Sequence, residues 1–188
     1  MWGAAADGFR VETPRLVLRA FRPADLDALM RIGRDPRVAR MMCSLPVRWT
    51  RRQAATWVAR SCFRGEPAFR LAIEGRNDEC SEGLVGVAGI AGAPVSLAYF
   101  LDPAVWGRGY ATEAMRGFLA AVFARFPGLD VLAADHFADN PGSGRVLGKL
   151  GFERLGCGTG RSLARLEPAP NIHYRLIRAK FEALHEIP

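Results

Sequence analysis

The segment that decides the fold is S-L-A-Y-F-L-D-P-A-V-W-G-R-G-Y-A-T-E-A-M-R-G-F-L-A-A-V-F, residues 96–123. An apolar run, Leu97 to Leu101, ends at an Asp-Pro pair, and Gly107 and Gly109 then bracket Arg108. Beyond the glycines, apolar residues recur with the spacing of one helix face. This order predicts a strand, a glycine-rich turn and a helix.

A helix that begins directly after such a turn is suited to binding an anion. Its first N–H groups have no partners within the helix, and they carry the positive end of the helix dipole. The two glycines let the backbone approach a phosphate closely, and Arg108 adds a positive charge between them. The segment therefore predicts a ligand that carries phosphate.

The spacing excludes two common nucleotide-binding turns. A P-loop requires a lysine after its second glycine, and no lysine stands here. A dinucleotide-binding turn requires a third glycine or alanine, but Thr112 occupies that position. A second glycine cluster lies in the run L-V-G-V-A-G-I-A-G, residues 84–92, with no helical pattern after it. We interpret that cluster as a tightly packed strand.

The residues around the glycine turn resemble a known family. W-G-R-G-Y-A-T-E-A, residues 106–114, is similar to the acyl-coenzyme A signature of the GNAT N-acetyltransferase superfamily, and most similar to the branch of the ribosomal-protein N-terminal (alanine/serine) acetyltransferases. Three further segments agree in order: E-T-P-R-L-V-L-R-A-F-R-P-A-D-L-D-A-L (12–29), D-N-P-G-S-G-R-V-L-G-K-L-G-F-E (139–153) and N-I-H-Y-R-L-I-R (171–178). The resemblance covers nearly the whole chain.

The patterns along the chain predict antiparallel strands first and then alternating strands and helices, an α+β fold. The expected strands are residues 11–21, 68–74, 84–90, 95–101, 129–136, a strand from 152, and 172–177; helices are expected from Pro23, Thr50, Gly109 and Asn140. The resemblance implies a GNAT-like mixed, mostly antiparallel twisted sheet of about seven strands, flanked by about four helices and splayed between strands 4 and 5. We expect a single domain over residues 1–188, with residues 1–10 as a flexible N-terminal arm.

The composition predicts a folded, basic protein. Apolar residues make up 49% of the 188 residues, and the net charge is +7. Lys149 and Lys180 are the only lysines, so 24 of the 26 basic residues are arginine. A compositional bias toward arginine explains this charge, which also suits a polyanionic cofactor such as coenzyme A. Because the arginines are scattered without a dense run, we do not predict a nucleic-acid-binding surface.

The chain contains no membrane-span pattern and no signal-peptide pattern at its start. The four cysteines, Cys43, Cys62, Cys80 and Cys157, are widely spaced, which predicts free thiols in a reducing compartment rather than a metal site. We therefore expect a cytoplasmic protein with no metal and no membrane partner. The resemblance allows a homodimer, which no motif specifies.

Residues 139–153 predict a short helix. Asn140 is suited to capping its start, Pro141 to its first position, and Gly151 to the position just past its end. The leucines of this helix must face the core, which places Ser143 near the inner side of the first turn. From spacing alone, Asn140 and Ser143 are a structural cap and a first-turn residue.

The resemblance implies that acetyl-CoA lies between the strand before the glycine turn and the strand before the second motif. The pantetheine arm would pair with the backbone near Phe100 and Leu101, and the N–H groups from Trp106 to Thr112 would hold the pyrophosphate. Asn140 would hydrogen-bond the pantetheine or a structural water, and Ser143 would protonate or hydrogen-bond the leaving thiolate. The implied catalytic residues are Ser143 and Asn140; the implied cofactor-binding residues are Phe100, Leu101, Trp106, Gly107, Arg108, Gly109, Tyr110, Ala111, Thr112, Asn140, Ser143, Arg145 and Lys149, the last two for the outer phosphate.

The implied mechanism is direct attack of a neutral amine on the acetyl carbonyl, which a backbone N–H polarises while a base or a water chain removes the amine proton. Relatives often carry a glutamate on the strand before the turn, but the matching position here is Ser96. The identity of the base therefore stays open, with Asp135 and His136 as candidates. Glu113 is expected to match the helix dipole instead.

The acceptor is expected to be a primary amine, on a protein N-terminus or on a small molecule, and its identity stays open, as does whether acyl groups other than acetyl are used. We expect acceptor contacts from residues 38–49 and 157–170, the least family-like parts of the chain. The absent glutamate and the positive charge also allow an alternative, a catalytically weak or inactive member that binds coenzyme A or RNA.

Overall fold

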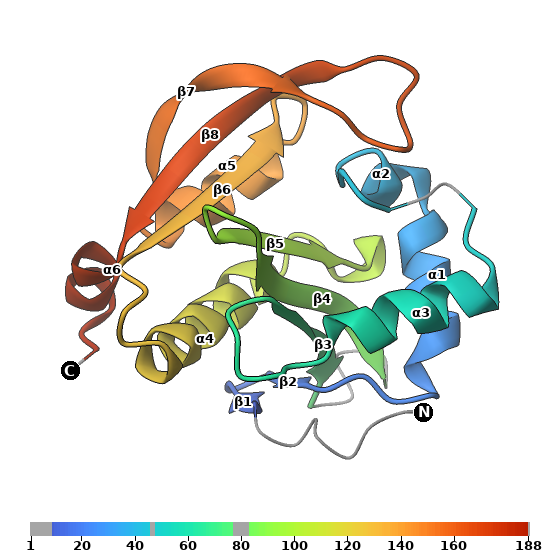
Figure 1. Ribbon diagram of the computed structural model, residues 1–188, viewed down its shortest axis with the longest axis horizontal. Helices are drawn as coiled ribbons and strands as arrows, with labels where there is room; N and C mark the ends of the chain where they lie inside the picture. Colours follow the sequence, from blue (N-terminus) through green and yellow to red (C-terminus); the bar gives the residue numbers. More distant parts are fainter. Residues whose placement is uncertain (1–8, 46–47, 77–82, 188) are drawn as a thin grey trace.

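The computed structural model describes residues 9–45, 48–76 and 83–187. These residues form a twisted eight-stranded sheet with the spatial order β1-β2-β3-β4-β5-β6-β8-β7 (Figure 1). The strands are β1 (Val11–Glu12), β2 (Leu16–Arg19), β3 (Phe69–Gly75), β4 (Leu84–Ala91), β5 (Ser96–Leu101), β6 (Val131–Phe137), β7 (Glu153–Gly160) and β8 (Ala169–Ile177). Neighbouring strands are antiparallel except for β5 and β6, which run parallel. The predicted mixed, mostly antiparallel α+β sheet is confirmed.

Helices cover both faces of this sheet (Figure 1). One face carries α1 (Asp25–Arg34), α2 (Pro36–Ala39) and α3 (Arg51–Ser61); the other carries α4 (Tyr110–Arg125), α5 (Pro141–Lys149) and α6 (Arg178–His185). Side chains alternate along β5, so that Phe100 joins the buried cluster of the first face while Leu97 and Leu101 join that of the second. Tyr99 therefore points toward the α4 and α5 side.

The strand predicted over residues 11–21 is two strands, so this prediction was wrong in detail. Residues 13–15 form a turn in which the Thr13 N–H donates to the Leu16 carbonyl at 2.9 Å, and β1 and β2 pair as a hairpin. Pro14 lies inside the turn, where its missing N–H removes no ladder hydrogen bond. The strands predicted as numbers 4 and 5 are consequently β5 and β6.

Two helices were not predicted. The first, α2, begins where the Asp35 side chain accepts a hydrogen bond from the Arg37 N–H, with Pro36 at the first helical position. The second, α6, follows β8 directly and begins at Arg178, the last residue of the segments that resemble the family. A 3-10 turn, Pro103–Val105, also separates β5 from the glycine turn.

The helix caps agree with their sequence signals. The Thr50 hydroxyl accepts from the Gln53 N–H, and the Gln53 side chain accepts from the Thr50 N–H, a capping box that starts α3. At the end of α5, Gly151 has a φ of 88° and its N–H donates to the Gly148 carbonyl, while the Phe152 N–H donates to the Leu147 carbonyl. These two bonds define a Schellman motif, so the predicted stop signal at Gly151 is confirmed.

A buried ion cluster joins the first strands to α1. The Arg19 guanidinium contacts both oxygens of Asp25, at 2.7 and 2.9 Å, and its Nε donates to Glu74 at 2.6 Å. The hydrogen bond from Arg19 lowers the pKa of Glu74, against the opposing effect of burial. Because Arg19 and Asp25 are almost fully buried, this cluster fixes how α1 sits against β2 and β3.

Several predictions fall on residues that the structure does not describe: the arm residues 1–8, residues 46 and 47 of the predicted acceptor segment, and Cys80. Phe9, which belongs to the predicted N-terminal arm, is buried against Phe63 and Phe69. Cys43, Cys62 and Cys157 are free thiols. Within the described ranges, no helix has the length and apolar character of a membrane span, and no group of three His, Cys, Asp or Glu side chains is placed to hold a metal.

Candidate functional site

A cavity lies where β5 and β6 separate. In the described chain these strands share one pair, Ser96 with Ala133, at which the Ala133 N–H donates to the Val95 carbonyl at 2.9 Å. The Ser96 hydroxyl donates to the Ala133 carbonyl at 3.2 Å, so this side chain closes the pairing. Beyond the pair the strands diverge around a cavity of about 820 Å³. The predicted splay is confirmed.

The exposed backbone edge of β5 forms one wall. The Asp102 N–H donates to the Val85 carbonyl on β4 at 2.8 Å. Because backbone groups alternate between the two sides of an antiparallel strand, the polar groups of Phe100 also face β4, whereas those of Tyr99 and Leu101 face the cavity side. Of the two residues near which the pantetheine arm was predicted to pair, Leu101 therefore has backbone groups on the cavity side, whereas Phe100 is paired with Val87 of β4 and lines the cavity with its side chain.

The glycine turn closes one end of the cavity. Gly107 and Gly109 have φ values of 78° and 81°, in the left-handed region that glycine adopts readily. Gly109 is the N-cap of α4, which therefore begins without the side-chain cap that Thr50 gives α3. The cavity lining from this part of the chain is Gly107, Gly109, Tyr110, Ala111 and Thr112. The turn thus has the backbone arrangement of an anion site.

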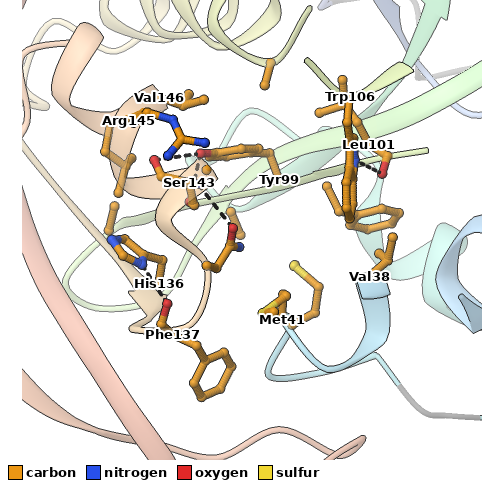
Figure 2. Close-up of a pocket in the computed structure, with 18 of the residues that line it drawn as sticks. Val38, Met41, Tyr99, Leu101, Trp106, His136, Phe137, Ser143, Arg145 and Val146 are labelled. Carbon is orange, nitrogen blue, oxygen red and sulfur yellow. Dashed lines mark hydrogen bonds between the residues drawn. The ribbon is translucent and has the colours of Figure 1, made fainter. Parts of the chain in front are cut away.

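Two residues of the turn differ from expectation. The Trp106 N–H donates to the Pro103 carbonyl at 3.3 Å, and its indole N–H donates to the Leu101 carbonyl at 2.9 Å, as Figure 2 shows. The backbone of Trp106 is thus used inside the protein, while its ring lines the cavity. Arg108 is exposed and does not belong to the described lining; its carbonyl accepts from Arg15 Nη1 at 3.1 Å.

The opposite wall is the first turn of α5. The Asn140 side-chain oxygen accepts from the Ser143 N–H at 3.2 Å, which confirms the capping role. The Ser143 hydroxyl lies 2.9 Å from the Tyr99 hydroxyl, and Figure 2 shows the hydrogen bond that joins the two side chains. Burial raises the pKa of Tyr99 to about 12, with the hydrogen bond to Ser143 acting in the opposite direction. The phenol is therefore protonated at neutral pH and can donate.

Two basic residues of α5 line the same cavity. Arg145 and Lys149 are both exposed and lie on the helix that carries Ser143. Figure 2 shows Arg145 beside Tyr99 and Ser143. The structure thus brings the predicted residues of the glycine turn, with the exception of Arg108, together with Ser143 and both predicted phosphate-binding side chains.

Asp135 and His136 differ in their capacity to act as a base. His136 Nδ1 lies 2.8 Å from the Phe137 carbonyl, which can only accept, so this nitrogen carries the proton. Nε2 then accepts from the Tyr174 hydroxyl at 3.1 Å, so both ring nitrogens are engaged. Asp135 is exposed on the cavity wall, where the Asn171 amide donates to one carboxylate oxygen at 3.1 Å.

A loop after α2 covers the remaining side of the cavity. We call residues 40–45 the α2 loop, and Met41, Met42, Cys43 and Ser44 from it line the cavity. Figure 2 shows Met41 and Val38 on the side facing Tyr99. The prediction that residues 38–49 contribute to this side is consistent with the lining, whereas the described lining contains no residue from 157–170.

Residues 161–168, the β7–β8 loop, hold the α2 loop from outside. Arg165 donates from Nε to the Arg40 carbonyl at 2.8 Å and from Nη2 to Asp139 at 2.7 Å. Arg40 also contacts Asp139 at 2.8 Å, and the Ser162 hydroxyl donates to the Met42 carbonyl at 2.8 Å. The hydrogen bond from Arg165 lowers the pKa of Asp139, with burial opposing it.

Sequence reasoning missed Tyr99 and Arg165. Tyr99 stands two residues from Leu97 and two from Leu101, so strand alternation already placed it on the same face as those core residues. No comparable signal marks Arg165, because its partners Arg40 and Asp139 are distant in the chain. The sequence could therefore have predicted the position of Tyr99, but not that of Arg165.

These features define an acetyltransferase of the GNAT type, and comparison with known proteins agrees. Residues 15–153 match the family described as the acetyltransferase (GNAT) domain, which is most of the chain. The protein therefore belongs to the GNAT acetyltransferase family, as its motifs indicated.

Individual relatives are more distant. The uncharacterized N-acetyltransferase YoaA of Bacillus subtilis (strain 168) is 27% identical over 150 residues, which cover 78% of this chain and 84% of YoaA. A GNAT-family acetyltransferase from Bacillus anthracis shares the fold with a TM-score of 0.74, 20% identity and coverage of 90% of this chain and 98% of that one. RimL, a ribosomal-protein acetyltransferase in complex with coenzyme A, has a TM-score of 0.72, 15% identity and coverage of 90% and 98%.

Proposed function

We propose that this protein is an acetyl-CoA-dependent N-acetyltransferase that transfers an acetyl group directly to a primary amine. The observation that carries the proposal is the cavity between β5 and β6, whose lining contains both the glycine turn at the start of α4 and the Tyr99–Ser143 hydroxyl pair. Membership of the GNAT family and the coenzyme A complex of RimL support it.

The residues present fit acetyl-CoA. The amides of the pantetheine arm need backbone partners, which the cavity-facing N–H and carbonyl of Tyr99 and the N–H of Leu101 would supply, while the Leu101 carbonyl accepts from the Trp106 indole. The pyrophosphate needs N–H groups at a helix start, which the turn at Gly107 and Gly109 provides. When bound, acetyl-CoA supplies the acetyl group as an activated thioester.

The hydroxyl pair is suited to stabilise the departing sulfur. With a pKa of about 12, Tyr99 stays protonated and can donate to the Ser143 oxygen. The Ser143 proton is then free to point into the cavity, toward the position where negative charge develops on a leaving thiolate. Such a pre-placed donor acts where charge appears in the transition state.

Asp135 is our candidate for the group that takes the amine proton. It lies on the cavity wall, and the Asn171 amide fixes its orientation. The other carboxylate of the described lining, Asp139, is instead bound between Arg40 and Arg165. The acceptor would enter beside the α2 loop, and an α-amine of a protein N-terminus or a small primary amine both satisfy this geometry. RimL is described as an alpha-N-protein acetyltransferase, which supports a protein N-terminus as the acceptor.

A panel of peptides and small amines tests the proposal, with release of the coenzyme A thiol as the signal. Ser143→Ala is expected to lower kcat by about 10²-fold while the Kd for coenzyme A, measured by calorimetry, stays unchanged. Ser44→Ala, a serine on the opposite side of the same cavity, is the matched control and should retain kcat. Absence of coenzyme A binding by the wild-type protein would overturn the proposal, and unchanged turnover of Ser143→Ala would remove the role of that hydroxyl.

A further inference from the structure

The turn of the β1–β2 hairpin is bonded to the glycine turn, although nearly a hundred residues separate them. Arg15 donates from Nη1 to the Arg108 carbonyl at 3.1 Å, and from Nε to Glu113 at 2.6 Å. The Arg15 N–H and the Thr13 hydroxyl both donate to the other oxygen of Glu113, at 2.8 and 2.7 Å. The segment Thr13 to Arg15 therefore lies against the first turn of α4.

Arg15 touches the glycine turn at three successive positions. Its guanidinium holds the carbonyl of Arg108, lies 4.3 Å above the Tyr110 ring, and approaches within 3.5 Å of the place where a Cβ on Gly109 would stand. The Arg108 carbonyl lies between the two residues with left-handed φ values. A bond to this carbonyl therefore fixes the peptide plane whose orientation sets the direction of the neighbouring N–H groups.

Glu113 connects the same segment to the helix. Burial opposes ionisation of Glu113, but the hydrogen bonds from Thr13 and Arg15 outweigh it and lower its pKa. A carboxylate in the first turn of a helix would otherwise repel a bound phosphate through its negative charge. Because Arg15 neutralises Glu113 by a 2.6 Å ion pair, the positive end of α4 stays available for an anion.

We infer that Arg15 is a positioning residue for the cofactor: it holds the Gly107–Gly109 turn and the Glu113 carboxylate in the arrangement that binds the pyrophosphate. This inference rests on the proposed function. Arg15 itself does not line the described cavity. The T-P-R segment, residues 13–15, therefore has an indirect role in cofactor binding, through the glycine turn and Glu113.

The test compares Arg15→Ala with Arg76→Ala. Arg76 holds the same hairpin, through the Thr13 carbonyl at 3.0 Å and Glu12 at 3.3 Å, and among the described residues its side-chain contacts do not extend to the glycine turn. Two acyl donors are used: acetyl-CoA, and S-acetyl-pantetheine, which lacks the pyrophosphate. Arg15→Ala is expected to raise the KM for acetyl-CoA and the Kd for coenzyme A by about tenfold or more, the equivalent of one lost hydrogen bond with a charged partner, with little change in kcat. The kcat/KM for S-acetyl-pantetheine should match the wild type, and Arg76→Ala should match it with both donors.

A loss of the same size with both donors, or an equal loss in Arg76→Ala, would show a general structural effect and overturn the inference. Arg15→Lys covers the case in which Arg15→Ala does not fold. One ammonium cannot reproduce the fork that reaches both Arg108 and Glu113, so its affinity for coenzyme A should also fall. Wild-type affinity in Arg15→Lys would contradict the inference. If the wild-type protein binds coenzyme A and the variants bind equally well, the inference alone fails; if the wild type does not bind it, the proposed function fails.

Discussion

Replacing Gly144 with alanine is expected to destabilise the protein, whereas the same change at Gly148, one turn further along α5, is expected to stabilise it. Alanine is favoured over glycine in a helix by about 1 kcal/mol, so each variant begins with that gain. A Cβ at Gly148 would meet no atom within 4 Å, and the gain should be retained. A Cβ at Gly144 would lie 2.8 Å from His136 Nε2 and 3.5 Å from the Tyr174 hydroxyl.

The His136 ring cannot move away without losing hydrogen bonds and packing contacts. Its ring is 6% exposed and is held at both nitrogens, by the Phe137 carbonyl and the Tyr174 hydroxyl. Overpacking of this kind costs about 1–3 kcal/mol, which exceeds or cancels the gain in helix propensity. The free energies of unfolding of Gly144→Ala and Gly148→Ala should therefore differ by about 2 kcal/mol, or about 4–8 °C in Tm for a chain of this size.

Thermal and urea unfolding of the two variants measure this difference. The displacement of α5 from β6 should also move Ser143, so Gly144→Ala is expected to lose turnover while Gly148→Ala retains it. An increase in Tm of the same size in both variants would refute the reasoning, because it would mean that α5 and His136 are not in tight contact. Loss of stability with full activity in Gly144→Ala would refute the link between this packing and the site.

Three further outcomes are expected. Tyr99→Phe should lower kcat by about tenfold by removing the hydroxyl that is hydrogen-bonded to Ser143, yet leave the pH profile unchanged below about pH 10, because the wild-type phenol stays protonated there; an altered profile would contradict this. Asp135→Asn should lower kcat/KM for amines by about 10²-fold with coenzyme A affinity retained, and wild-type rates would exclude it as the base. The contribution of Glu74 to the free energy of unfolding, measured with urea, should be complete above about pH 4.3, the ordinary pKa of glutamate, and should be lost as the pH falls through the lower folded-state pKa of Glu74. Glu74→Gln should therefore weaken the dependence of stability on pH in this acidic range.

The predictable parts of the site carry local signals. Gly107 and Gly109 are needed where φ is positive, and Asn140 caps a helix by reaching a residue three positions away. Such features depend on residues within one turn of the chain, so a sequence pattern is enough to place them. The same holds for the capping box at Thr50 and the helix stop at Gly151.

Other features depend on partners or registers that a pattern does not contain. The pairing of β5 with β4 determines whether the backbone N–H and carbonyl of Phe100 or those of Leu101 face the cavity, and the sequence of β5 does not specify this pairing. Tyr99 meets Ser143 across 44 positions, and Arg15 meets Glu113 across 98. The split of the first predicted strand is different, because Pro14 was a visible signal against a continuous strand.

This division has a physical consequence for the two sides of the cavity. On the proposed cofactor side, the glycine turn would bind through its own backbone and the start of α5 through the Ser143 hydroxyl, so recognition there is tied to a few nearby residues. The proposed acceptor side is the α2 loop, which Arg165 and Ser162 of the distant β7–β8 loop hold by hydrogen bonds. Changes in either loop can therefore reshape the acceptor entrance without altering the peptide planes at Gly107 and Gly109. That separation explains why the motifs predict the activated donor but do not specify the amine.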